Sequence, residues 1–358
     1  MSKMSGGRKL LLYISMFLLM GLFIEVLATV LVYQNYHRYI SESIQYKGRS
    51  ATGYLLKKLL ERINPPPSRK AFGSTPEPFR VPDSLHGYRI GNGSFEVFYQ
   101  HGVLDTVERF KYYVTIKDDG SRYVGTPPFP TERDVYVFGD SFIFGEGVND
   151  EQTFTYLLQS RFPNTRFHLY ANPGHSLTNA HVNFQRLAPK IGREDVVILG
   201  YAYFYDERHV ASPVRMKYWG QPHSHKSQDP KSFKHLRARL IGDSLVIDKI
   251  PLFCEYLGDY CNQPEPQQSY MDSVTARLIN DIAKSTEAQV YLLHFQGNLR
   301  KEMTAMVDPR VRICLATPET FDYKYRDDIN GFDRHPGPYW NHAIYRRLSD
   351  TLRSQGYK

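Results

Sequence analysis

Short apolar runs alternate with amphipathic stretches through the second half of the chain. The apolar runs predict strands, and the stretches of helical spacing between them predict helices. The predicted strands are residues 134–138, 166–171, 195–199, 289–295 and 311–315. The predicted helices are residues 153–162, 176–188, 272–286 and 338–353. Short apolar strands that alternate with helices indicate a parallel sheet covered on both faces, so we expect an α/β domain over residues 131–358.

The longest apolar run lies near the N-terminus, at residues 10–33. It is long enough to cross a bilayer as a helix. Three basic residues before it, Lys3, Arg8 and Lys9, favour a cytoplasmic N-terminus with the rest of the chain exported. We therefore expect a transmembrane signal anchor over residues 1–33 and a periplasmic or extracellular location for the remainder.

Two features of this run leave questions open. Val26-Leu27-Ala28 satisfies the small-residue rule for signal-peptide cleavage, so a cleaved leader is the alternative to an uncleaved anchor. Glu25 within the span is costly in hydrocarbon, which leads us to expect either a partner helix of another membrane protein or a position near the interface.

Three further segments differ from the alternating pattern. Residues 34–84 are expected to be a stalk and linker, in which residues 54–63 form a helix that packs on its own domain or lies on the membrane surface. Residues 85–130 are rich in Tyr, Phe, Val and Gly and predict a few antiparallel strands. Residues 207–270 form a long insertion after the third predicted strand, either a lid over a site or a peripheral subdomain.

The composition and net charge limit the classes of partner that the protein is expected to bind. The chain is 41% hydrophobic and 23% charged, as in a globular protein, and its net charge of +8 favours anionic partners. The basic residues are scattered and form no nucleic-acid-binding motif, so we expect no nucleic-acid partner. Cys254 and Cys261 are spaced to close a small loop by a disulfide in an oxidising compartment. Cys314 lies in an apolar stretch and is expected to be buried.

Candidate chemistry begins where the first predicted strand ends, at Gly139-Asp140-Ser141. A serine in such a turn can be a nucleophile when a base takes its proton and a carboxylate orients that base. Asp333 and His335, just before the last predicted helix, are residues of the required types. Gly174 and Gly200 also follow strands, and the carboxyl ends of parallel strands meet at one edge of a sheet, so we expect these positions to converge.

These segments resemble the SGNH hydrolases, also called the GDSL family. Gly139-Asp140-Ser141 matches the first block of the family, Gly174 the second, and Asp333 with His335 the last. The third block departs from the pattern, because Gly200 is present but the asparagine that normally follows is missing. The resemblance covers residues 130–355 and implies a three-layer flavodoxin-like sandwich around a five-stranded parallel sheet.

The resemblance also implies roles. Ser141 would be the nucleophile, His335 the general base and Asp333 the carboxylate that orients it. The backbone N–H groups of Ser141 and Gly174 would bind the oxyanion. The missing third donor needs a substitute, and the candidates are Asn179, Asn172, Tyr203 and Tyr205.

Two other patterns are weaker. Ile241-Gly242-Asp243-Ser244 repeats the tripeptide, but its surroundings predict a strand, a turn and a strand, so we do not expect Ser244 to be catalytic. Histidines and carboxylates also gather after the predicted strands, without convincing metal-ligand spacing. We therefore predict no metal and no cofactor. The residues concerned are His175, His181, His209, Asp206 and Glu207.

The sequence favours an exported serine esterase that cleaves O-acyl groups, most plausibly acetyl, on an envelope or extracellular polysaccharide. The substrate is inferred from the resemblance, the expected export and the 27 Tyr and 21 Phe, since aromatic rings stack well on sugars. The alternative is a polysaccharide O-acetyltransferase that forms the same acyl-enzyme. A third possibility is a non-catalytic glycan-binding or assembly protein with a degenerate site.

Overall fold

The computed structural model describes residues 13, 15–27, 72–101, 108–219, 229–295, 299–316 and 335–357. The chain divides into two units, residues 1–69 and residues 70–358. In the first unit, residues 15–27 are helical, and most of their apolar side chains are exposed. Among the described residues, none of the helices combines the length and apolar character that a membrane span needs. The expected span at residues 10–33 falls partly outside the described residues and stays a prediction.

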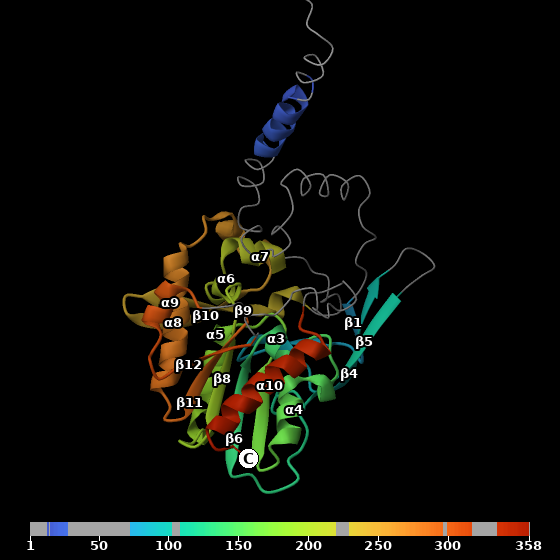
Figure 1. The fold of residues 1–358 in the computed structure, drawn as a ribbon, viewed down its shortest axis with the longest axis vertical. Coiled ribbons are helices and arrows are strands. Elements are labelled where there is room, and N and C mark those ends of the chain that lie inside the picture. Colours follow the sequence, from blue (N-terminus) through green and yellow to red (C-terminus); the bar gives the residue numbers. More distant parts are fainter. Residues whose placement is uncertain are drawn as a thin grey trace, which may run out of the picture. The chain divides into compact units, whose positions relative to one another are not determined.

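The core of the second unit is a five-stranded parallel sheet in the order β12-β11-β8-β6-β7 (Figure 1). Its strands are β6 (Arg133–Gly139), β7 (Thr165–Ala171), β8 (Val196–Tyr201), β11 (Gln289–His294) and β12 (Arg312–Leu315). All five strand predictions are confirmed to within two residues at their ends. Strand β6 lies between β7 and β8, so the chain reverses its direction of travel across the sheet at β6.

Four helices cover this sheet, and they confirm the helix predictions. They are α4 (Phe154–Arg161), α5 (Leu177–Leu187), α8 (Gln268–Lys284) and α10 (Pro338–Ser354). Helix α4 follows β6 toward β7, whereas α5 leads back from β7 to β8. Because such crossovers are right-handed, α4 and α5 lie on opposite faces of the sheet. Helix α10 packs beside α4, as Figure 1 shows, and α8 packs beside α5, which completes a three-layer α/β sandwich.

An antiparallel segment precedes the parallel sheet. Strands β1 (Phe72–Thr75), β4 (Gly93–His101) and β5 (Glu108–Ile116) form one sheet in the order β1-β4-β5. Strands β2 (Arg80–Asp83) and β3 (Gly87–Ile90) form a separate pair. The prediction of antiparallel strands is confirmed, but they begin at Phe72, within the stretch expected to be linker. Arg122 pairs with Ile116 and with Leu169, and so joins this segment to the parallel sheet.

The described part of the expected insertion is built around a hairpin. Strands β9 (Lys234–Ile241) and β10 (Ser244–Pro251) pair with Ser244 opposite Ile241, so the second Gly-Asp-Ser is a hairpin turn as predicted. Its helices and turns are α6 (Tyr205–His209), α7 (Pro213–Trp219), η3 (Pro230–Ser232), η4 (Cys254–Tyr256) and η5 (Gly258–Asn262). Elsewhere lie α3 (Ser141–Phe144), η1 (Asp150–Gln152), η2 (Ala188–Lys190) and α9 (Lys301–Met306).

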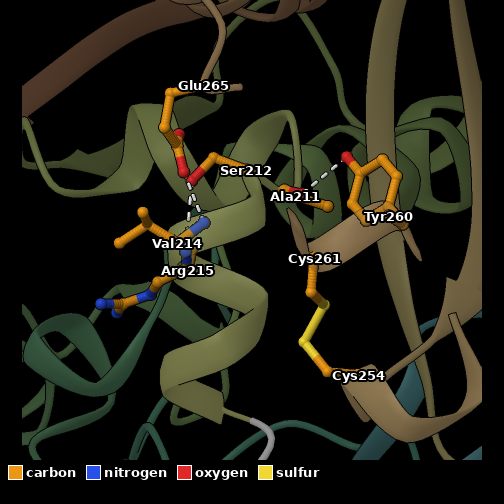
Figure 2. Close-up of a disulfide and its surroundings, with 8 residues drawn as sticks. All are labelled: Ala211, Ser212, Val214, Arg215, Cys254, Tyr260, Cys261 and Glu265. Carbon is orange, nitrogen blue, oxygen red and sulfur yellow. Dashed lines mark hydrogen bonds between the residues drawn. A yellow bond between two sulfur atoms is a disulfide. The ribbon is translucent and has the colours of Figure 1, made fainter. Parts of the chain in front are cut away.

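A disulfide closes the end of the insertion. Cys254 and Cys261 are bridged, whereas Cys314 is a buried free thiol. Figure 2 shows the bridge beside α7, where the Tyr260 hydroxyl donates a 2.8 Å hydrogen bond to the carbonyl of Ala211. The Glu265 carboxylate accepts from a backbone N–H at the start of α7. These contacts hold η5 against α7.

Candidate active site

Ser141 is the first residue of α3, directly after β6. The Asp140 carboxylate caps this short helix by accepting a 2.8 Å hydrogen bond from the N–H of Phe142. The helix ends after one turn at Gly145, whose φ of 78° is left-handed. The serine therefore stands on a sharp strand-to-helix turn at the carboxyl edge of the sheet, where a nucleophile can face a substrate.

Two glycines allow this turn to lie close to the sheet. A Cβ added at Gly139 would lie 2.3 Å from the Ile143 side chain, and one at Gly200 would lie 2.1 Å from it. Real Cβ atoms do not approach so closely, so Ile143 packs directly onto the backbones of β6 and β8. The glycines that end the first and third predicted strands are thus required for packing of α3.

Arg122 holds the loop that follows the serine. Its guanidinium is fully buried and donates to the carbonyls of Phe144, Gly145 and Val148 at 2.5, 2.8 and 2.7 Å. It also forms a 2.8 Å ion pair with Asp150. Burial lowers the pKa of Arg122, while Asp150 opposes that shift. Sequence reasoning missed this residue, because no motif marks it.

The Asp140 carboxylate connects Ser141 to a buried arginine. The Ser141 hydroxyl donates to Asp140 Oδ2 at 3.2 Å, and Arg208 Nη1 donates to the same oxygen at 2.8 Å. Arg208 also donates to the carbonyl of His175 at 3.1 Å. Its guanidinium lies over the ring of Tyr205, 5.3 Å from the centroid. Burial and the nearby Asp140 charge raise the pKa of Tyr205.

His335 lies against the same loop. Its Nε2 is 3.2 Å from Glu146 Oε2, and its ring contacts that of Phe142 edge-on. The N–H of Glu146 donates to the Ser141 carbonyl at 2.9 Å. The Ser141 hydroxyl donates its hydrogen bond to Asp140 rather than to His335. The third predicted residue, Asp333, lies outside the described residues.

Gly174 has a left-handed φ of 84°, and a Cβ there would lie 2.4 Å from the Tyr88 hydroxyl. The predicted asparagines nearby are engaged elsewhere. Asn172 Oδ1 accepts from the N–H of Ile90 at 2.9 Å. The Asn179 amide accepts from the N–H of Ser176 at 3.2 Å and donates to the carbonyl of His86 at 3.4 Å. Both amides are therefore engaged by the surrounding backbone.

The residues after β8 form a buried polar network. Asp206 Oδ1 accepts from the hydroxyls of Tyr201 at 2.9 Å and Thr275 at 2.7 Å. Arg300 binds the carboxylates of both Asp206 and Asp272. Burial raises the pKa of Asp206, and Arg300 opposes this shift. In the described part of the chain, no group of three or more His, Cys, Asp or Glu is placed to hold a metal ion.

The buried histidines near the site serve as hydrogen-bond partners of the framework. His175 Nε2 donates to the carbonyl of Tyr88 at 2.9 Å, and His235 Nε2 donates to that of Arg208 at 2.8 Å. His209 Nε2 accepts from the N–H of Leu177 at 3.2 Å. Burial lowers the pKa of all three, that of His235 to about 4. They are therefore neutral at pH 7.

The chain matches no family model and no curated protein. Among solved structures, it is similar to a member of the lipolytic protein G-D-S-L family from Veillonella parvula, with 10% identity and a TM-score of 0.35 over 62% of this chain and 98% of that one. A putative lipolytic protein of the G-D-S-L family from Desulfitobacterium hafniense has 12% identity and a TM-score of 0.34 over 61% and 99%. A variant of an acetyl xylan esterase from Geobacillus stearothermophilus has 10% identity and a TM-score of 0.32 over 64% and 97%.

Proposed function

We propose that this protein is an SGNH-type serine hydrolase that cleaves O-acyl esters through Ser141. The observation that carries the proposal is the placement of Ser141 on the strand-to-helix turn after β6, with His335 against the same loop. Strand β6 is the point where the strand order reverses. Ligands of doubly wound sheets bind outside the carboxyl ends of the strands at such a point.

In the proposed reaction, the Ser141 oxygen attacks the ester carbonyl while His335 takes its proton. His335 then returns a proton to the departing alcohol, and water releases the acyl group from the serine. The imidazole must first turn its Nε2 from Glu146 toward Ser141. Asp333 is proposed to orient the imidazole through the other ring nitrogen.

The backbone N–H groups of Ser141 and Gly174 are proposed to receive the oxyanion. Neither N–H is a donor in the backbone hydrogen bonds of the described turns and loops. Two donors aimed at the developing charge are the core of such a site, and loss of one donor commonly costs about 10²–10³ in turnover.

We propose an acetylated envelope or extracellular polysaccharide as the substrate. The Cys254–Cys261 disulfide supports a location outside the cytoplasm, since such bonds persist in oxidising compartments. Attachment by a single membrane-spanning segment at the N-terminus, with the catalytic unit outside the cytoplasm, remains part of this proposal. So does a membrane partner protein near Glu25.

O-acetyl transfer to a polysaccharide is the second candidate. It would form the same acyl-enzyme on Ser141, and a sugar hydroxyl in place of water would accept the acyl group.

Labelling of the full chain with a fluorophosphonate probe tests the nucleophile. We expect labelling of the wild type and of Ser244→Ala, and no labelling of Ser141→Ala. Ser244 is a matched control, because it ends an identical Gly-Asp-Ser in the hairpin turn. Absence of labelling in the folded wild type would refute the hydrolase and leave non-catalytic glycan binding. If the wild type is labelled, comparing acetate release with acetyl transfer to added glycan distinguishes an esterase from an O-acetyltransferase.

A further inference from the structure

The ends of three neighbouring strands are joined by one buried side chain. Arg208 follows β8, its Nη1 binds Asp140 after β6, and the same nitrogen binds the carbonyl of His175 after β7. The Arg208 side chain is 9% exposed and the Asp140 side chain 0%. The carbonyl belongs to the residue directly after Gly174. Arg208 thus lies between the serine turn and the turn of the second proposed oxyanion donor.

The negative charge of Asp140 affects the proposed reaction, because it lies beside the Ser141 oxygen. Its Oδ2 lies 3.2 Å from the Ser141 oxygen, on which negative charge develops during attack. A buried carboxylate at that distance opposes this charge, because interactions between charges are strong away from water. Arg208 donates to that same Oδ2 and so offsets the negative charge beneath the nucleophile.

The guanidinium is itself held in place. It lies over the rings of Phe204 and Tyr205, 4.7 and 5.3 Å from their centroids. The Arg208 carbonyl accepts a 2.8 Å hydrogen bond from His235 in β9, so the hairpin of the insertion fixes its backbone. A planar, stacked guanidinium can address two acceptors at once, which a flexible ammonium does less well.

We infer that Arg208 is a positioning residue for the reaction at Ser141, where it neutralises Asp140 and sets the Gly174 turn relative to the serine. This inference rests on the proposed function.

The test uses the full chain and a double-mutant cycle on an activated acetyl ester. Arg208→Met keeps the length of the side chain and removes its charge, and we expect kcat/KM to fall by about 10²–10³, the usual cost of a lost electrostatic group at such a site. Asp140→Asn in that background keeps the cap on Phe142 and removes the opposing charge. We expect the double variant to recover at least about tenfold, since residues in direct contact act non-additively.

Two further variants separate charge from folding. Arg208→Lys is expected to retain more activity than Arg208→Met, because it keeps the positive charge. Arg277→Met removes an exposed Arg–Asp pair on α8 and is expected to leave kcat/KM unchanged. Thermal melts confirm that each variant is folded at the assay temperature, and the charge-balanced double variant keeps the test decisive if Arg208→Met does not fold.

The outcomes are distinct. Activity of Arg208→Met within about threefold of an active wild type overturns the inference alone, as does a double variant whose loss equals the product of the single losses. A folded wild type that neither hydrolyses the ester nor reacts with a fluorophosphonate overturns the proposed function and this inference with it.

Discussion

Arg122→Met should detach the loop that follows Ser141, the proposed nucleophile. The substitution keeps a long apolar stem and removes the guanidinium that binds three loop carbonyls and Asp150. Arg122 is 0% exposed, so water cannot replace the lost donors without opening the structure.

The magnitude follows from these contacts. Removing one partner of a buried ion pair destabilises by about 3–5 kcal/mol, because the other charge is left uncompensated. The Asp150 side chain is 12% exposed, so some of its charge can be hydrated and the lower half of that range applies. The three carbonyls add to the cost, since an unsatisfied buried acceptor costs about 1–3 kcal/mol. Taking the lowest cost for each carbonyl, we expect a total loss of about 6–7 kcal/mol.

Urea unfolding followed by fluorescence measures this loss, and fluorophosphonate labelling reports the serine turn. The double variant Arg122→Met with Asp150→Asn should regain about 1–2 kcal/mol, because no buried charge remains unpaired. A loss below about 1 kcal/mol, together with labelling at the wild-type rate, would refute the reasoning. It would mean that the loop keeps its shape without the guanidinium.

Three other predictions concern the same region. Burial lowers the pKa of His235 to about 4. The stability that the neutral imidazole contributes is complete above pH 6.5 and is lost as the pH falls toward 4, a loss of about 3 kcal/mol. In urea unfolding, the His235→Gln variant should therefore lose less stability over that pH range than the wild type. Asp333→Asn should lower kcat by about 10³–10⁴ and Glu146→Gln by about tenfold, whereas the reverse order would make Glu146 the carboxylate that orients the imidazole. Gly200→Ala should destabilise by about 1–3 kcal/mol through overpacking, whereas Gly192→Ala, where a Cβ would meet its nearest neighbour at 3.5 Å, should not.

The parallel sheet could be predicted because the pattern of apolar residues within each strand is enough to identify that strand. Its apolar runs are buried on both faces, and the helices between them carry one apolar side, so period alone separates the two. The place of Ser141 followed from the same pattern, since a polar turn directly after a buried strand must lie at the edge of the sheet. The first two antiparallel strands, β1 and β2, were not predicted, because they are short and rich in proline, which is typical of a linker. Pro82 lies within β2, and Pro76 and Pro78 lie between the two strands.

The supports of the site could not be predicted, because their function depends on partners far away in the sequence. Arg208 stands in Asp206-Glu207-Arg208, a run that is typical of an exposed helix, yet all three residues are buried. Arg122 precedes Ser141 in the sequence and has no local pattern around it. In the sequence, Glu146 has the pattern of a loop residue between two glycines. Its contact with His335 arises only when the chain folds. Such pairings are invisible to periodicity and to motifs of fixed spacing.

The contacts of Arg122 and Arg208 also give a structural role to the parts of the chain outside the parallel sheet. The antiparallel segment leads into Arg122, which holds the loop after Ser141. The insertion supplies His235, which fixes the backbone of Arg208, and through Arg208 the carboxylate beneath the serine. The serine turn is therefore held from two sides by elements that the five strands and four helices do not contain. It follows that the insertion need not close over a substrate to affect the proposed reaction, since a change in β9 reaches Ser141 through two hydrogen bonds and one ion pair.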